Sequence, residues 1–283
     1  MNDYRAKLFG EVETILLTTD ASDFSAGGVQ EAIFFSQACG AKLVVLHVIE
    51  IKTEAATAAH SSVALKRQEA EAHLAEIEKM AKDSDIDCSI VVSESYQPDR
   101  TIIDEAWKAN ADVIIMGRHG RRGLLKLLVG SMTSRIIGYG FPKVLVVPKD
   151  FTITGARILI ATDGSEFSKL AAKEAISLAT HCSNLEKVLV VSVAAKEEDL
   201  SLARENANAV VEEAKKSNIA DIFEVVAAVG KAGEIICQTA ETNGADMILI
   251  GGFGESGIMK KIMGHVTEDV IGGAHCAVLV VEE

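Results

Sequence analysis

Short apolar runs alternate with longer amphipathic stretches along the whole chain. The runs are almost continuous Val, Ile and Leu, which is typical of parallel strands that are buried on both faces. The stretches between them mix apolar, alanine and charged positions, as amphipathic helices do. Pro98 is a good first-turn residue for one of these helices. We expect helices over residues 65–82, 99–110, 168–181 and 200–217.

The same unit occurs twice in the sequence. Four apolar segments reappear in the same order, at offsets of 143, 145, 134 and 134 residues: 15–22 as 158–165, 42–48 as 187–193, 111–117 as 245–251, and 144–147 as 278–281. Self-similarity at so long a period indicates a duplicated structural unit. The falling offset makes the second unit 11 residues shorter, and the surplus of the first lies in residues 51–64, which we expect to form an exposed loop before a helix.

Each unit alternates strands and helices and ends on a fifth strand. This order predicts an α/β fold of two tandem, doubly wound, five-stranded parallel sheets with right-handed crossovers. We expect one domain over residues 1–150 and a second over residues 151–283. The connection at 149–155 is short, so the two halves should pack against each other. Ligands in such sheets bind beyond the carboxyl ends of the strands.

Composition excludes several classes of protein. Apolar residues make up 48% of the chain and charged residues 24%, as in folded globular proteins. The net charge of −13 disfavours a protein that coats nucleic acid or an anionic membrane, and 5% aromatic residues offer few platforms for stacking bases. No apolar run approaches the roughly 18 residues that cross a bilayer, and the first residues do not resemble a secretory signal. We therefore expect a cytoplasmic protein without nucleic-acid or membrane partners.

The cysteines and histidines form no recognisable cluster. The five cysteines are odd in number, scattered and without a CxxC pair, which disfavours a disulfide framework or a zinc site. We interpret them as small buried thiols in a reducing compartment. The seven histidines include no HExxH or similar pair, so we assign no metal site.

A long glycine loop follows the fourth strand of the first unit. The pattern G-x-x-G-x9-G-S spans residues 117–131 and leads into a short helix expected over 132–137. Glycines let backbone N–H groups approach an anion, and a helix start with the hydroxyls of Ser131 and Thr133 favours a phosphate. The alternative is a solvated basic loop in which the glycines only form turns. It is not a Walker A loop, because Gly-Lys-[Ser/Thr] is missing. The segment 118–135 has no acid and five basic residues: Arg118, Arg121, Arg122, Lys126 and Arg135.

Asp20 follows the first strand, and Asp163 takes the same place in the second unit. A carboxylate at this position can accept hydrogen bonds from the hydroxyls of a ribose. It can equally cap the helix that follows, because Asp-x-Ser is also N-cap chemistry. The repeat does not decide between the two roles, since a shared cap explains it as well as a shared ligand does.

These motifs resemble the universal stress protein family in its tandem, ATP-binding form. The resemblance is carried by residues 19–22, 46–48 and 115–120 and by the glycine loop, and it covers nearly the whole chain. It implies a Rossmann-like fold of the adenine nucleotide hydrolase type, which binds ATP with Mg²⁺ or Mn²⁺ carried by the phosphates. The nucleotide-binding residues that it implies in the first unit are Thr19, Asp20, Val48, Met116, Gly117, His119, Gly120, Gly130, Ser131, Met132 and Thr133.

Within this set, the resemblance assigns Asp20 to the ribose or adenosine and the backbone of Val48 to the adenine edge. His119 either touches a phosphate or bonds the loop backbone. Family dimers pair through their last strands, so residues 144–147 and 278–281 are expected to pair within this chain as a pseudo-dimer, and a homodimer of two whole chains is an open alternative. The N–H groups implied to cradle the phosphates belong to Gly117, Gly120, Gly130, Ser131 and Met132.

The second unit keeps the glycine spacing but loses the polar residues around it. His265 stands where the family has Ser or Thr, and Glu268 and Asp269 lie at the helix start. Acids there satisfy the helix dipole and repel a polyphosphate. We expect ATP in the first unit, with the second weakened, empty or holding a less charged nucleotide. The corresponding positions of the second unit are Asp163, Val193, Gly251, Gly254 and Gly264.

Three functions are compatible with the sequence. The first is a nucleotide-dependent stress-response or signalling module, in which bound ATP alters contacts with protein partners that the sequence does not identify. The second is a weak ATPase or adenine-nucleotide hydrolase, although no positioned general base is evident and no catalytic residue is assigned. The third is an interaction scaffold that binds no nucleotide.

Overall fold

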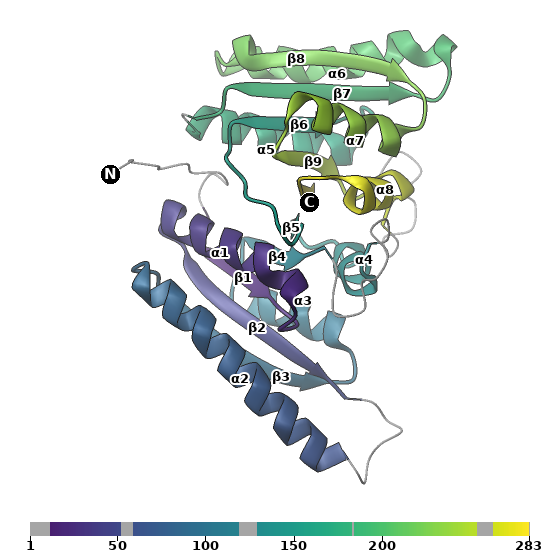
Figure 1. Cartoon of the computed structure of the whole chain (residues 1–283). Helices are drawn as coiled ribbons and strands as arrows, with labels where there is room; N and C mark the ends of the chain where they lie inside the picture. The colour runs from purple at the N-terminus through teal and green to yellow at the C-terminus, as the bar shows by residue number, and fades with distance from the viewer. Residues whose placement is uncertain (1–11, 52–58, 119–128, 183, 254–262, 283) are drawn as a thin grey trace.

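The computed structural model describes residues 12–51, 59–118, 129–182, 184–253 and 263–282, and within these ranges the strands of the two repeats join into one ten-stranded sheet. Pairing is parallel inside each repeat, and the strand order is β3-β2-β1-β4-β5-β10-β9-β6-β7-β8 (Figure 1). The first repeat contributes β1 (Thr14–Thr18), β2 (Lys42–Glu50), β3 (Cys88–Ser95), β4 (Val113–Gly117) and β5 (Lys143–Val147). The second repeat contributes β6 (Arg157–Ala161), β7 (Lys187–Ala194), β8 (Phe223–Val229), β9 (Met247–Gly251) and β10 (Ala277–Val281).

Helices cover both faces of this sheet, so the predicted doubly wound α/β fold is confirmed. One face is covered by α1 (Ala26–Cys39), α2 (Ala59–Asp83), α5 (Glu166–His181) and α6 (Leu200–Lys216). The other face is covered by α3 (Pro98–Lys108), α4 (Ser131–Gly138), α7 (Ala232–Asn243) and α8 (His265–Gly273). Among the described residues, no helix combines the length and the apolar character needed to cross a membrane.

The four long helices predicted from the sequence are present, and one boundary differs by more than two residues. We expected residues 51–64 to form a loop, but α2 already begins at Ala59, while residues 52–58 lie outside the described ranges. Alanine has high helix propensity, and lengthening a helix that is already anchored by packing needs no new nucleation. Residues 59–64 therefore extend α2 toward its N-terminus.

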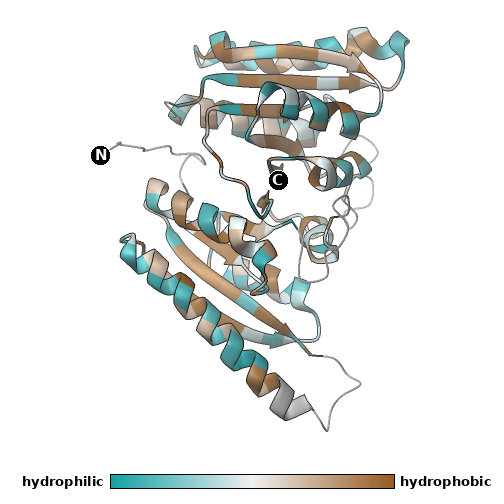
Figure 2. Cartoon of the chain, viewed as in Figure 1, coloured by the Kyte–Doolittle hydropathy of each residue, from teal (hydrophilic) through white to brown (hydrophobic). Residues whose placement is uncertain are grey.

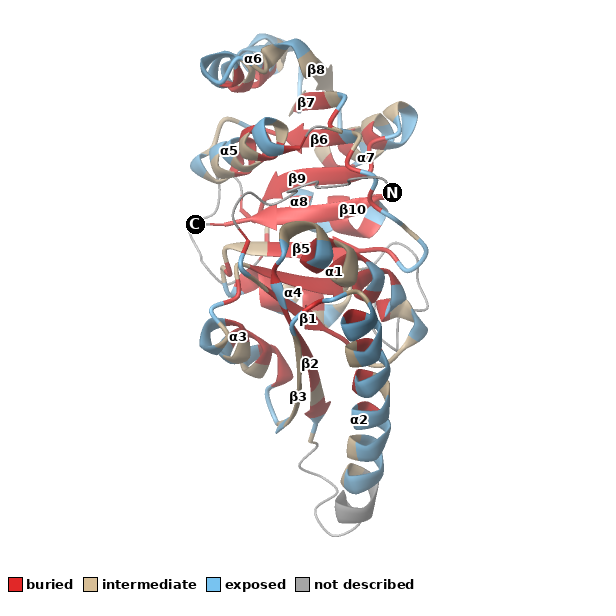
Figure 3. Ribbon diagram, turned by 90° about the vertical axis from the view of Figure 1, so that its left-hand side faces the viewer, coloured by how far each residue is buried: buried red, intermediate tan, exposed pale blue. Residues whose placement is uncertain are grey.

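The inner strands carry most of the core. Figure 2 shows the strands largely in the hydrophobic colour, and Figure 3 shows the central strands of the sheet almost entirely buried. The edge strands β3 and β8 are only half-buried along most of their length. On each face of the sheet, one cluster of buried apolar side chains includes residues of both repeats, so the two repeats share their core.

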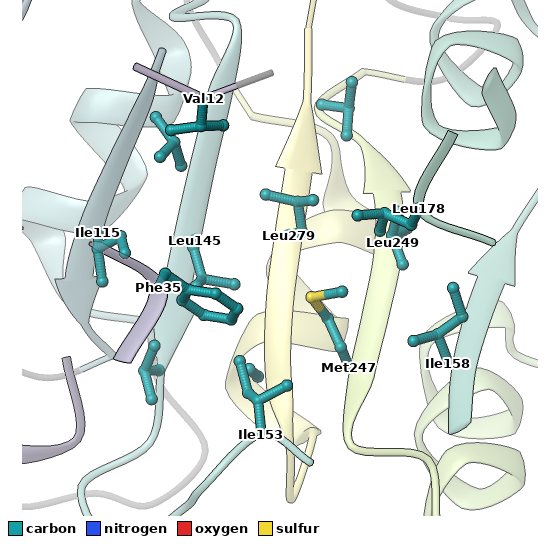
Figure 4. Close-up of a cluster of buried hydrophobic side chains, with 14 of the residues drawn as sticks. Val12, Phe35, Ile115, Leu145, Ile153, Ile158, Leu178, Met247, Leu249 and Leu279 are labelled. Atoms are coloured by element: carbon teal, nitrogen blue, oxygen red, sulfur yellow. The ribbon is translucent and has the colours of Figure 1, made fainter. Parts of the chain in front are cut away.

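The two repeats meet through their last strands. β10 runs antiparallel to β5, with Leu279 opposite Leu145, which confirms the pseudo-dimer predicted for residues 144–147 and 278–281. One cluster of buried apolar side chains continues across this junction on the side of α1 and α5. Figure 4 shows side chains of both repeats in this cluster, among them Phe35, Leu145, Ile153, Met247 and Leu279.

The five cysteines are all free thiols. Cys182 and Cys276 are buried, and the other three are half-buried. The expectation of small thiols without a disulfide therefore holds, while full burial applies to only two of them.

We expect the two repeats to unfold together, because the buried cluster crosses the junction. Leu279→Ala in β10 removes a fully buried side chain and should lower the free energy of unfolding by about 2–5 kcal/mol. Trp107, the single tryptophan, lies in α3 of the first repeat. Urea unfolding followed by Trp107 fluorescence should therefore show the lower free energy of unfolding, although the substitution lies in the second repeat.

The matched control is Leu202→Ala in α6, where the side chain is 55% exposed. Its urea unfolding midpoint should equal that of the wild type within experimental error. A Trp107 transition that stays at the wild-type midpoint in Leu279→Ala, while circular dichroism shows a shifted second transition, would mean that the repeats unfold independently.

Candidate functional site

The candidate site of the first repeat lies where the strand order reverses. The chain builds β2 and β3 on one side of β1 and then places β4 on the other side. Thr18 at the end of β1 pairs with Leu46 of β2 and with Met116 of β4, which is buried. Such a switch point at the carboxyl edge is the usual ligand site of an open α/β sheet. Just beyond these partners, at the same edge, come three of the predicted site residues: Asp20, Val48 and Gly117.

Short polar contacts hold the loop that follows β1. Oδ1 of Asp20 accepts hydrogen bonds from the N–H of Ser22 at 3.0 Å and from its hydroxyl at 2.6 Å. The buried hydroxyl of Thr19 lies 2.8 Å from that of Ser25 and 3.2 Å from Nε2 of His73 in α2. Asp20 therefore shapes its own turn. The residue at the N-cap position of α1 is Ser25, so Asp20 does not occupy the helix-capping position considered above. Its role toward a ribose is still a prediction.

The second repeat builds the same turn. Oδ1 of Asp163 accepts the N–H of Ser165 at 3.0 Å, and the hydroxyls of Thr162 and Ser168 lie 3.1 Å apart. The pattern Thr-Asp-x-Ser-x-x-Ser thus recurs as a structural unit at 19–25 and 162–168. The sequence analysis missed this unit and missed His73. The turn could have been found from the sequence, because the same pattern occurs in both repeats. Nothing in the sequence indicates that His73 lies beside β1.

Ala21 adopts an unusual backbone conformation in this turn. Its φ is +57°, in the left-handed region that favours glycine, and its counterpart Gly164 has φ +81°. The side-chain amide of Asn206 in α6 donates a hydrogen bond to the Asp163 carbonyl at 2.9 Å. A Cβ added at Gly164 would lie 2.6 Å from Oδ1 of Asn206. The first repeat therefore carries strain at a position where the second repeat uses glycine.

Gly117 is required by a close approach of two chain segments. A Cβ on Gly117 would lie 2.6 Å from the carbonyl oxygen of Phe24, just before α1. A Cβ on Gly251, which ends β9 in the second repeat, would lie 2.8 Å from the carbonyl carbon of Phe167. Both glycines thus let the end of the fourth strand of a repeat pack directly on the chain at the start of the first helix of that repeat, α1 or α5. This packing role stands beside the predicted phosphate role.

Two backbone hydrogen bonds close the base of the glycine loop. The N–H of Arg118 donates to the Val147 carbonyl at 3.0 Å, and the N–H of Gly130 donates to the Arg118 carbonyl at 3.3 Å. The Gly130 N–H, implied above to face a phosphate, is therefore used within the loop itself. The second repeat closes in the same way, from the N–H of Gly264 to the Gly252 carbonyl at 2.9 Å. Three predicted residues lie outside the described ranges: His119, Gly120 and Gly254.

The short helix predicted after the loop is α4, and it begins at Ser131. Its first hydrogen bond runs from the N–H of Ser134 to the Gly130 carbonyl at 3.1 Å. The N–H groups of Ser131, Met132 and Thr133 therefore have no partner within the helix. Such a helix start is suited to an anion, because its N–H groups and its dipole both favour negative charge.

The two hydroxyls at this helix start are not equivalent. Ser131 is exposed, whereas Thr133 is 2% exposed and belongs to the interior. In the second repeat, the hydroxyl of the matching Thr267 donates to the Gly251 carbonyl at 2.8 Å. We therefore retain the hydroxyl of Ser131 as a candidate phosphate ligand, while Thr133 can offer only its N–H.

The two basic residues of the segment 118–135 that the structure describes, Arg118 and Arg135, make separate contacts. Arg118 donates from Nη1 to the carbonyls of Ile271, at 3.4 Å, and Ala274, where α8 of the second repeat ends. Burial lowers the pKa of this guanidinium, but a cation at a helix C-terminus is favourable. Arg135 donates from Nε to the carbonyl of Ser131 at 3.2 Å. Arg118 thus serves the contact between repeats and not a phosphate. Three basic residues lie outside the described ranges: Arg121, Arg122 and Lys126.

The corresponding place in the second repeat is more apolar. Phe253 stands where the first repeat has His119, is buried, and packs edge to face on Phe167 with ring centroids 5.3 Å apart. Val193 is half-buried near the end of β7, as Val48 is in β2. His265 is the exposed first residue of α8.

One prediction for the second repeat needs correction. We placed two acids at the start of α8, but only Glu268 lies in its first turn. The Asp269 side chain packs instead against Gly233 of α7. A Cβ added at Gly233 would lie 2.5 Å from the Cβ of Asp269. Successive helical residues point in directions about 100° apart, so neighbouring acids face different surroundings.

A model of one protein family, the universal stress protein family, matches residues 11–148 and again residues 156–282. The chain belongs to the universal stress protein family. Each matched stretch contains one complete five-stranded unit, so this universal stress protein is a tandem member.

Similar universal stress proteins occur in archaea and cyanobacteria. One from Synechocystis is 27% identical and is matched over 92% of this chain and 96% of its own length. One from Methanocaldococcus jannaschii is 30% identical and is matched over 48% of this chain and 81% of its own length. The crystal structure of one from Archaeoglobus fulgidus superposes with a TM-score of 0.76 at 21% identity, covering 95% of this chain and 98% of that chain. This last likeness shows a shared fold over nearly the whole molecule.

Ala21→Gly should raise the free energy of unfolding by up to about 1 kcal/mol. The left-handed conformation costs a non-glycine residue about 1–2 kcal/mol, and the greater freedom of glycine in the unfolded chain offsets part of the gain. Urea unfolding at equilibrium measures the change. The reverse substitution in the second repeat, Gly164→Ala, should destabilise by about 1–3 kcal/mol, because it adds both strain and a contact with Asn206. A less stable Ala21→Gly variant would show that Ala21 is unstrained.

Proposed function

We propose that this universal stress protein binds ATP in its first repeat and acts as a nucleotide-dependent stress-response or signalling module in the cytoplasm. Its two domains are residues 1–150 and 151–283. The observation that carries the proposal is the convergence of Asp20, Val48 and the start of α4 at the switch point of a doubly wound sheet.

The end of β2 is suited to the adenine base. Thr18 is the last residue of β1 to pair with β2, opposite Leu46, and the N–H of Thr19 donates to the Leu46 carbonyl at 3.0 Å. Alternate residues of a strand direct their N–H and C=O toward the same neighbouring strand. Those of Val48 therefore point to the side of β1, beyond the point where β1 has ended. There they can bond the edge of a base, with Asp20 beside them for the ribose.

The start of α4 is suited to the phosphates. The N–H groups of Ser131, Met132 and Thr133 and the exposed hydroxyl of Ser131 are the donors available in the described part of the loop. Several such donors at one helix terminus can hold a polyphosphate without an adjacent lysine.

The metal ion belongs to the nucleotide in this proposal. Among the described residues, no three His, Cys, Asp or Glu side chains gather in a way that could hold a metal ion. Mg²⁺ readily keeps its waters and binds through substrate phosphates, and Mn²⁺ also prefers oxygen ligands. Mg²⁺ or Mn²⁺ would shield the charge of the triphosphate where it meets the helix start.

The second repeat is proposed to bind ATP more weakly. The contact of Phe253 with Phe167 puts apolar surface where the first repeat has a histidine, and Glu268 adds a negative charge to the first turn of α8. His265 removes the serine hydroxyl at the helix start. One like charge near a partly exposed site costs on the order of 1 kcal/mol, so the combined changes could weaken binding about a hundredfold.

The experiment identifies the nucleotide released when freshly purified protein is denatured, and its molar ratio to the chain. We expect about one ATP per chain. Gly130→Asp places a carboxylate at the start of α4 and should weaken Mg-ATP binding about tenfold or more in calorimetric titration. Gly264→Asp makes the same change at α8 and is the matched control, which should retain the bound ATP. Circular dichroism confirms that both variants are folded.

Each other outcome has a defined meaning. Two nucleotides per chain, each lost in one of the two variants, would keep nucleotide binding and reject the asymmetry. No bound nucleotide and no heat of binding with Mg-ATP would reject the proposed function and favour a scaffold. Steady release of ADP or AMP above background would favour the hydrolase instead.

A further inference from the structure

The junction between the repeats contains a half-buried ion pair. Glu174 in α5 of the second repeat lies 2.7 Å from Nζ of Lys143, the first residue of β5 in the first repeat. The two side chains are only 13% and 23% exposed. An acid on a helix of one repeat therefore meets a base on the last strand of the other.

The equivalent place at the other end of the junction lacks the base. The offset of 143 relates Glu174 to Glu31 in α1, and both lie in the sequence Glu-Ala-Ile. The offset of 134 relates Lys143 to Ala277, the first residue of β10. Glu31 is completely buried, and its Oε1 accepts the N–H of Ile153 at 3.1 Å. Its Oε2 has no hydrogen-bond partner among the described residues.

A second buried acid, Asp246 of the other repeat, accepts a hydrogen bond from Thr154, the residue next to the Ile153 that donates to Glu31. Asp246 directly precedes β9, whose first residue pairs with Ala277. Its Oδ2 accepts the N–H groups of Thr154 and Ala156 at 3.2 and 3.3 Å, and its Oδ1 has no partner among the described residues. Two buried carboxyl groups of opposite repeats thus share one end of the junction, and they repel each other when both are ionised.

The other titratable groups at this end do not supply the missing base. His275 packs its ring on Phe151 with centroids 6.0 Å apart, and Arg118 donates to the Ala274 carbonyl. Burial raises the pKa of the Cys276 thiol to about 12, so it stays protonated. In the described part of the chain, Asp246 is the charged group that acts on Glu31.

We propose that this end of the junction is a proton switch, in which Glu31 is protonated in the tightly packed state and its ionisation weakens the contact with the second repeat. Burial, opposed by the Ile153 N–H and reinforced by Asp246, raises the pKa of Glu31 from 4.5 to about 7. Because the pKa of Glu31 is higher in the folded than in the unfolded state, its contribution to the free energy of unfolding is complete below about pH 4.5. It is lost as the pH rises through about 7.

The test compares the wild type with Glu31→Gln, which keeps the acceptor for Ile153 and cannot ionise. Urea unfolding of the full chain is measured from pH 5 to 8.5. The ratio of the wild-type unfolding constant to that of the variant should rise by up to about tenfold per pH unit and level off above pH 7. The variant should be as stable as the wild type near pH 5 and more stable at pH 8.

Glu174→Gln is the matched control, because it neutralises the acid that does have a lysine partner. It should lower stability at every pH in this range and leave the wild-type pH slope in place. Equal pH slopes for the wild type and Glu31→Gln would overturn the proposal, as would a slope that disappears in Glu174→Gln. Any nucleotide that copurifies with the protein adds equally to the stability of the wild type and of Glu31→Gln, so it cancels in the ratio of their unfolding constants.

Discussion

The antiparallel pairing of β5 with β10 is the contact on which the rest of the molecule depends. Each repeat alone would leave its last strand as an open edge, and the pairing closes both edges against each other. The same contact carries the buried cluster from one repeat into the other. It also brings side chains of different repeats together: Lys143 at the start of β5 meets Glu174 in the middle of α5, and Arg118 reaches the end of α8.

Within this frame the duplicated backbone is kept and the side chains around it differ. Both repeats retain the Thr-Asp-x-Ser turn, the glycine that ends the fourth strand and the hydrogen bond that closes the glycine loop. These features are set by packing and backbone geometry, which any working copy of the unit must satisfy. The side chains at the carboxyl edge of the sheet and at the junction are not needed for this packing and backbone geometry, so they can differ between the repeats. Histidine is replaced by Phe253 at one place, and lysine by Ala277 at another.

The candidate site and the junction share a residue. The backbone of Arg118 closes the base of the glycine loop in the first repeat, while its guanidinium bonds carbonyls at the end of α8 in the second. The helix start that is proposed to hold phosphates therefore follows a loop whose base is tied to the other repeat. This connection exists because β4 lies next to β5, the strand of the first repeat that forms the junction.

The sequence by itself determined the fold class and the duplication, because apolar periodicity and repeat offsets are local or directly countable. The pairing of residues 144–147 with 278–281 was expected only from the resemblance to the universal stress protein family. The sequence also located the start of α4 to within one residue. Only the tertiary structure decided that His73 lies beside Thr19, that Arg118 turns to the other repeat, and that Glu31 is buried without a base. In each case the partner lies far along the chain, and only packing of the whole sheet brings the two groups together.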